Sequence, residues 1–192
     1  KIFDGNKINV YKTLKNAIQF LKLKPGSSIT EAELKRILEV SRTPIREALI
    51  RLSGDLLIDI FPQSGTYISK IDLHLAKEMA YMRHILETEI LLDLCKMKKD
   101  LSTCVSESLF FMKQAISKQD VIAYIKTDNM YHQAIFNYAG HEIIWNMISN
   151  SRMHYIRFLM LDMAFPDSMQ KSFKQHNGIV KCIKEGDSEG LR

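Results

Sequence analysis

The chain has 192 residues, of which 46% are hydrophobic and 26% are charged, values that exclude a disordered or collagen-like protein. It carries 27 Lys and Arg against 22 Asp and Glu, a formal net charge of +5. Residues 1–70 hold 12 of the basic and 7 of the acidic side chains, so residues 71–192 are neutral and the whole positive excess lies in the first third. The length allows one large domain or two small ones.

The chain has no uninterrupted apolar stretch of the ~18 residues that a membrane-spanning helix needs. Its three cysteines are odd in number and lack C-x-x-C spacing, which favours a reducing compartment over a disulfide framework. No secretion signal opens the sequence. We therefore expect a soluble, cytoplasmic protein with no membrane contact.

Two helices are predicted at the start of the chain. Apolar residues recur at helical spacing over residues 9–23, and Lys-Pro-Gly follows directly. Thr30 then stands three residues before Glu33, which is the spacing of a capping box. A second helix should therefore run from this box to about Leu38.

A third helix should begin at Ser41, a good N-cap, with Pro44 tolerated in its first turn. Strand-like runs over residues 57–61 and 66–68 follow, separated by turn residues at 62–65. Two helices joined by a tight turn and followed by a hairpin form a winged helix-turn-helix. We expect this domain to occupy residues 1–70.

The remaining residues, 71–192, show long helical periodicities and no strand signal, which predicts an all-α helical bundle and a mainly α protein. The predicted helices cover residues 73–98, 101–117, 119–139, 141–163 and 168–185. Breaks are expected near Lys99-Asp100, Gly140 and Pro166.

The third predicted helix has the side chains of a DNA-reading helix at its leading end. Arg42 and Arg46 are four residues apart and share the face opposite the apolar stripe, while Ser41 and Thr43 add hydroxyl groups. A guanidinium suits bidentate contact with guanine or phosphate, and a helix N-terminus favours phosphate. The alternative is that both arginines belong to an ordinary solvated face.

The order of these residues resembles the DNA-binding domain of the GntR family of bacterial transcription regulators. The resemblance covers about residues 8–70 and is strongest in the S-R-T-P-x-R-E-A-L pattern that begins at Ser41. It implies that Arg42, Thr43 and Arg46 contact operator DNA and that Gly65 lets the tip of the wing approach the DNA backbone. Leu56 departs from the family, which usually has glycine there, so the entry into the first strand should differ slightly.

One pair in the second half has metal-ligand spacing. Asp128 and His132 are four residues apart in a helical segment, so both side chains leave the same face. Carboxylate and imidazole together suit a divalent metal such as Zn, Ni or Mn. The spacing alone is common, and a surface ion pair is the default interpretation.

Residues 128–132 resemble the D-x-x-[FY]-H motif of the effector domain in the FadR-like branch of the GntR family, and residues 175–187 resemble its E-H-x-x-I…G-D motif. The resemblance implies that Asp128, His132 and His176 ligate a metal at the floor of a helical cavity. It also implies a third histidine on a last helix, beyond Arg192. Gln175 replaces the usual glutamate.

Arg83 begins an R-x-x-[IL]-E pattern on the first helix of the second half. The resemblance implies that this arginine lines the cavity, where it would clamp the carboxylate of an effector. The alternative is an internal pair with Glu87, four residues later.

The sequence as a whole predicts a ligand-responsive transcription regulator and not an enzyme. The resemblance implies a repressor that binds double-stranded operator DNA at the nucleoid and a small organic acid. A homodimer is expected, because one recognition helix reads too few base pairs for selectivity. Two alternatives stay open: a metal-dependent helical hydrolase with a basic domain, and a nucleic-acid module whose helical half only dimerises.

Overall fold

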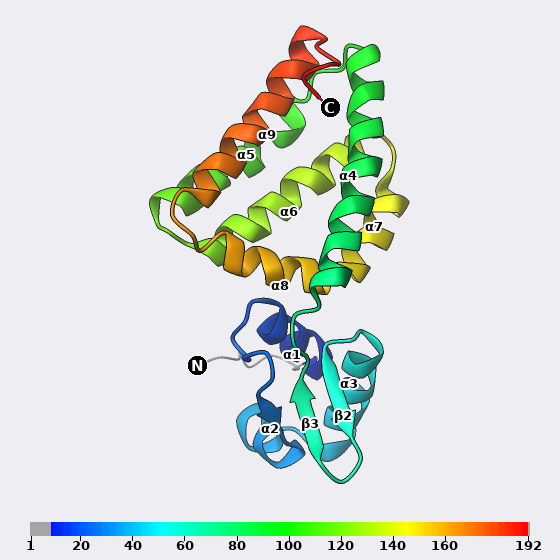
Figure 1. Cartoon of the computed structure of the whole chain (residues 1–192), viewed down its shortest axis with the longest axis vertical. Coiled ribbons are helices and arrows are strands. Elements are labelled where there is room, and N and C mark those ends of the chain that lie inside the picture. The colour runs from blue at the N-terminus through cyan, green and yellow to red at the C-terminus, as the bar shows by residue number, and fades with distance from the viewer. Residues whose placement is uncertain (1–8, 192) are drawn as a thin grey trace. The chain divides into compact units, whose positions relative to one another are not determined.

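The computed structural model describes residues 9–191 and separates them into two compact units on either side of the Asp72–Leu73 bond. The described residues are mainly helical with one small sheet, as the sequence predicted (Figure 1). None of the helices in residues 9–191 combines the length and the apolar composition needed to cross a membrane.

The first unit contains three helices, and α1 and α2 both pack on α3. They are α1 (Val10–Gln19), α2 (Glu31–Leu38) and α3 (Arg42–Gly54). The predicted capping box is present, with the Glu33 backbone N–H donating to Thr30 Oγ1 and the Thr30 N–H to the Glu33 carboxylate. The first helix ends at Gln19, earlier than predicted, and just beyond it Leu21 takes a left-handed conformation while the Leu23 N–H donates to the Ala17 carbonyl at 3.1 Å.

The sheet of this unit has three antiparallel strands in the order β1-β3-β2. β2 (Ile58–Phe61) and β3 (Gly65–Ile68) form the predicted hairpin, with Ile58 opposite Ile68. β1 (Ser28–Ile29), which the sequence did not predict, pairs with β3. Two residues carry too little pattern to show as a strand.

Leu56 adopts the backbone conformation that glycine adopts without cost, with φ at 59°. Its carbonyl accepts a hydrogen bond from the Ser69 hydroxyl at 2.9 Å, which holds this turn before β2. A left-handed conformation costs a non-glycine residue about 1–2 kcal/mol. The chain therefore keeps this turn despite its leucine.

We expect Leu56→Gly to raise the free energy of unfolding by about 1 kcal/mol relative to Leu56→Ala, because glycine relieves the left-handed conformation and alanine does not. Leu56→Ala is the matched control, since it removes the same side-chain contacts. Urea unfolding of the two variants measures the difference, and an alanine variant as stable as the glycine variant contradicts this explanation.

The second unit is all helical, as predicted. Its helices are α4 (Leu73–Lys96), α5 (Ser102–Ser117), α6 (Val121–Tyr138), α7 (Glu142–Ser151), α8 (Met153–Asp162) and α9 (Ser168–Glu185). The single helix predicted over residues 141–163 is wrong, because the helix breaks at Arg152. Just before the break, the side chains of Ser149, Asn150 and Ser151 donate to backbone carbonyls three or four residues back, and such bonds weaken a helix.

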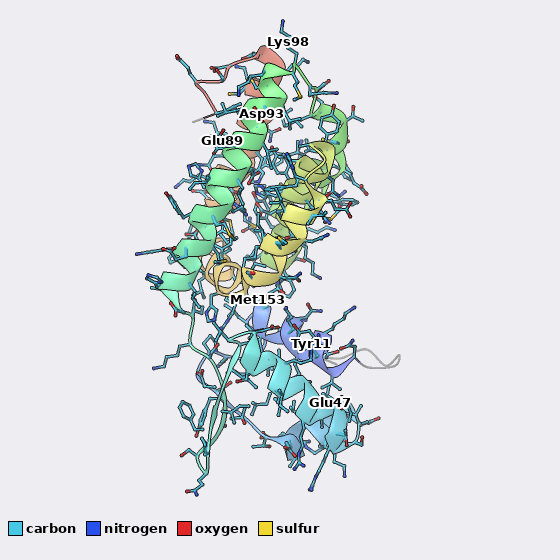
Figure 2. All side chains as sticks on the ribbon, turned by 90° about the vertical axis from the view of Figure 1, so that its right-hand side faces the viewer. Tyr11, Glu47, Glu89, Asp93, Lys98 and Met153 are labelled. Atoms are coloured by element: carbon cyan, nitrogen blue, oxygen red, sulfur yellow. The ribbon has the colours of Figure 1, made fainter. Side chains whose placement is uncertain are left out.

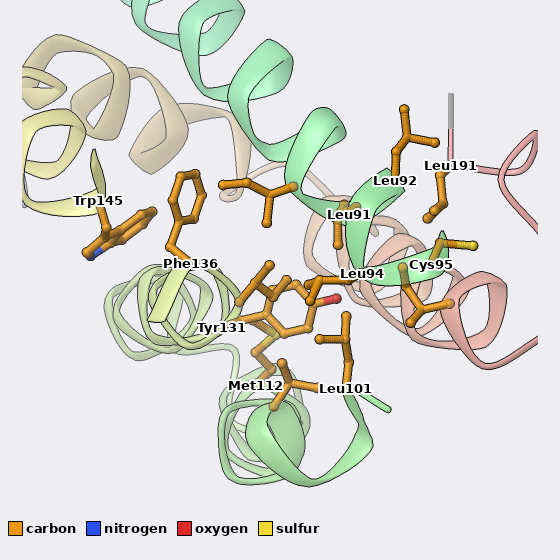
Figure 3. Packing of buried hydrophobic residues seen from close by; sticks show 14 of the residues in the cluster. Leu91, Leu92, Leu94, Cys95, Leu101, Met112, Tyr131, Phe136, Trp145 and Leu191 are labelled. Carbon is orange, nitrogen blue, oxygen red and sulfur yellow. The ribbon is translucent and has the colours of Figure 1, made fainter. Parts of the chain in front are cut away.

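Helix α6 runs through the middle of this unit and contacts α4, α5, α7 and α8 (Figure 1). Tyr131, Ile135 and Phe136 on α6 are fully buried, with Trp145 of α7 against Phe136 (Figure 3). The apolar residues of α6 fix its rotation, which turns Asp128 and His132 into the interior as well. The core of the unit thus positions the polar site described next.

Candidate DNA-reading helix and metal centre

The N-terminal turn of α3 is exposed and carries four of the predicted DNA-binding residues. Ser41 is the N-cap, as predicted, but its hydroxyl makes no capping hydrogen bond. Arg42, Thr43 and Arg46 are all exposed, whereas Ile45, between them, is fully buried in the core of the first unit. The structure therefore presents both guanidinium groups to solvent at a helix N-terminus, where anions are favoured.

Arg46 has an acidic partner that was not predicted from the sequence. Its Nε lies 2.8 Å from Glu31 Oε1 at the start of α2, and this pairing raises the pKa of the guanidinium. The Arg46 side chain remains 62% exposed. Glu31 therefore fixes the direction of Arg46 without covering it.

Gly65 opens β3 at the tip of the hairpin with φ at 115°, a conformation that other residues rarely adopt. A Cβ at this position would contact the Tyr67 ring at 3.6 Å. The Tyr67 hydroxyl donates to the Ser64 carbonyl at 3.0 Å, which stabilises the turn. The positive φ explains why glycine stands at this position.

The three predicted metal ligands converge inside the second unit. His176 Nε2 lies 3.1 Å from Asp128 Oδ1 and 3.2 Å from His132 Nε2, and His132 Nε2 lies 3.6 Å from Asp128 Oδ1. All three residues are buried. Ligands about 2.0–2.1 Å from a tetrahedral zinc ion stand about 3.3 Å from one another, so these separations fit a shared divalent cation.

The hydrogen bonds on the far side of each ring decide which nitrogen faces this point. His132 Nδ1 contacts the Glu87 carboxylate, and His176 Nδ1 lies 2.6 Å from the Ser172 carbonyl oxygen. Each acceptor requires a proton on Nδ1, so both neutral rings direct an Nε2 lone pair toward Asp128. Three acceptor atoms with no donor among them repel one another unless a cation or a proton lies between them.

The charges around this point favour such a cation. Burial opposes the ionised form of Asp128, yet His132, His176 and Arg83 hold the pKa of Asp128 well below its usual range. Burial and Arg83 also oppose protonation of His132, but the carboxylates of Glu87 and Asp128 raise the pKa of its imidazole. The residues present therefore fit a divalent metal.

Arg83 lies on α4 beside this cluster and lines the same cavity of about 450 Å³. Its Nε is 3.8 Å from Glu87 Oε2, its Nη1 is 3.9 Å from Asp128 Oδ2, and its guanidinium stacks over the Tyr155 ring at 5.1 Å. Both contacts with carboxylates are longer than a hydrogen bond. Arg83 thus lines the cavity and also faces Glu87, which keeps both of its predicted roles open.

The pairing of Glu31 with Arg46 was not predicted from the sequence, and Glu87 was expected only as a partner of Arg83. Glu87 lies 45 positions from His132, a separation that carries no spacing signal. For Glu31, the capping box marks the first turn of α2, where acidic residues are favoured, but it does not identify a partner.

Comparison with protein families matches both units. Residues 6–68 match the model of bacterial regulatory proteins of the gntR family, and residues 78–192 match the FCD domain. The second match alone spans more than half of the chain.

Two curated relatives cover nearly the whole chain. An HTH-type transcriptional regulator of Streptomyces ambofaciens is 28% identical, over 95% of this chain and 77% of its own. The HTH-type transcriptional repressor RspR of Escherichia coli is 26% identical, over 95% and 80%. The solved structure of E. coli McbR/YncC shares the fold, with a TM-score of 0.71 at 24% identity over 95% and 87%.

Proposed function

Because the chain belongs to the GntR family of bacterial regulatory proteins and carries an FCD domain, we propose that it is a repressor that binds operator DNA through α3. We assign DNA binding to residues 1–70 and effector binding and dimerisation to residues 71–192. The observation that carries the proposal is the exposed leading turn of α3, where Arg42 and Arg46 stand free of the core. Ser41, Thr43 and Gly65 complete the proposed contacts.

We propose that the protein acts in the bacterial cytoplasm, at the nucleoid, as a homodimer. A single α3 presents only a short row of side chains, and two-fold pairs of such helices read palindromic half-sites. Curated relatives include repressors, among them a gluconate operon transcriptional repressor of Bacillus licheniformis that is 25% identical over 87% of this chain. This supports repression as the direction of control.

The proposed effector is a small organic acid that binds in the cavity of the helical unit. Asp128, His132 and His176 would hold a divalent metal, and this ion would act as a Lewis acid that binds a carboxylate oxygen of the effector. Arg83 would pair with the same carboxylate, because it lines the cavity next to Asp128. We expect the dimer to have two arrangements of its DNA-binding domains, one that binds the operator and one that does not. Effector binding changes operator occupancy only if these two arrangements differ in their affinity for the acid.

A screen of organic acids tests this proposal. Metal-loaded protein is heated with each acid, and an acid that binds the folded state raises the melting temperature. We expect at least one such acid also to release the protein from operator DNA. If acids that raise the melting temperature leave DNA binding unchanged, the helical unit serves another purpose, such as dimerisation alone. The comparisons give no support to the hydrolase alternative.

We expect Glu31→Gln to lower selectivity for operator over random DNA by about 2- to 5-fold, because Arg46 loses the partner that directs it. Affinity for random DNA should rise, since one negative charge near the phosphates is removed. Glu47→Gln is the matched control: Glu47 follows Arg46 in the sequence, is exposed on α3 (Figure 2) and carries the same negative charge as Glu31. Fluorescence anisotropy with both DNAs measures the ratio, and an equal ratio in the two variants contradicts the role given to Glu31.

A further inference from the structure

Glu87 contacts His132 and is not one of the three proposed ligands. We infer that Glu87 is a positioning residue, which holds the His132 ring so that Nε2 faces Asp128 and His176. The inference rests on the proposed function, because it presupposes that these three residues bind a metal. Glu87 itself lies on the opposite side of the ring, at Nδ1, and is therefore not a ligand.

Glu87 is well placed to hold the ring. It lies on α4, which packs against α6, and it is only 6% exposed. One oxygen of its carboxylate contacts His132 Nδ1, and the other lies 3.8 Å from Arg83 Nε. Both oxygens thus face a nitrogen that carries a proton, so the carboxylate has one favoured orientation.

The ring of His132 needs such a partner. A neutral imidazole carries its proton on either nitrogen, and the hydrogen bond at one nitrogen sets the state of the other. Without an acceptor at Nδ1, the proton can sit on Nε2 and block the atom that would bind the metal. Outer-sphere carboxylates of this kind fix the tautomer and orientation of metal-binding histidines.

The two histidines are held by different means. The acceptor for His176 Nδ1 is the backbone carbonyl of Ser172, one turn earlier on α9, which no substitution removes. The acceptor for His132 is a side chain from another helix. Only His132 can therefore be released by a single substitution, and Glu87 is the residue to change.

The test compares zinc affinity, measured by chelator competition on folded full-length protein, among four variants. Glu87→Met removes the acceptor and keeps the side-chain length, and we expect its affinity to fall by about 10- to 100-fold. Glu87→Gln retains an acceptor oxygen and should fall less. Glu89→Gln, an exposed residue on the same helix (Figure 2), should match the wild type. His132→Ala should lose the zinc.

A second measurement reads the tautomer directly, by ¹⁵N NMR of the histidine side chains in metal-free protein at a pH where the rings are neutral. We expect a proton on Nδ1 of His132 in the wild type and in Glu87→Gln, and on Nε2 in a fraction of Glu87→Met. A change that affected only packing would leave the tautomer unaltered.

The outcomes separate the inference from the proposal beneath it. A wild type that does not bind zinc contradicts the metal site itself. Zinc binding that is lost in His132→Ala but unchanged in Glu87→Met overturns the role of Glu87. If Glu87→Met does not fold, the ¹⁵N NMR spectrum of the wild type tests the role of Glu87 by itself. A proton on Nε2 of His132 in the wild type shows that Glu87 does not hold the ring.

Discussion

Arg42→Ala and Arg46→Ala are each expected to weaken operator binding by roughly 5- to 150-fold, the equivalent of about 1–3 kcal/mol per bidentate contact. Both side chains are exposed at the leading turn of α3, so their removal leaves the core of the first unit intact. Affinity for random DNA should fall much less, because base contacts carry selectivity and phosphate contacts carry general attraction. Fluorescence anisotropy at several salt concentrations measures both quantities.

Lys12→Ala is the matched control for the loss of one positive charge. Lys12 is exposed on α1 and lies outside the α3 turn. Its removal should weaken binding to operator and to random DNA alike, with a smaller salt dependence. If Arg42→Ala and Arg46→Ala behave as Lys12→Ala does, the arginines belong to an ordinary solvated face and α3 is not the reading element.

His132→Ala and Asp128→Ala are each expected to lower the affinity for a divalent metal by more than about 100-fold, because each removes one of three converging ligands. The wild type should hold about one ion per chain. It should also gain about 2.7 kcal/mol of stability when the free metal exceeds the dissociation constant 100-fold. Elemental analysis after dialysis, together with thermal unfolding, checks both statements.

His84→Ala provides the control for this prediction. His84 lines the same cavity but does not belong to the converging group. We expect it to retain the metal at wild-type affinity. Equal metal content in wild type, His132→Ala and Asp128→Ala would contradict the proposed site. Loss of metal in His84→Ala alone would show that the metal binds elsewhere in the cavity.

The parts of the fold that the sequence predicted are those with local causes. The capping box at Thr30 set the start of α2, and two strand-like runs separated by turn residues predicted the hairpin. The parts that it missed depend on neighbours distant in sequence or on weak local competition. β1 exists because β3 offers it a partner, and the break at Arg152 lies just after three side chains that bond back to their own helix, a pattern that also occurs inside unbroken helices and so does not mark the break in the sequence.

The candidate site divides in the same way. Asp128 and His132 share a helix, so their spacing alone predicted that they lie together. His176 lies 44 residues from His132 and was predicted as a ligand only from the family resemblance. Glu87 and the Ser172 carbonyl complete the site from α4 and α9. Their roles depend on how the helices pack, which the residue pattern of a single helix does not specify.

Selection of binding sites from a library of random duplex DNA by the purified chain tests the central claim most directly. A regulator that reads DNA with paired α3 helices should enrich an inverted repeat, and the enrichment should disappear in Arg42→Ala while general DNA binding persists. A chain that enriches no sequence, or the same sequence with and without Arg42, would contradict the assignment of α3 as the reading element.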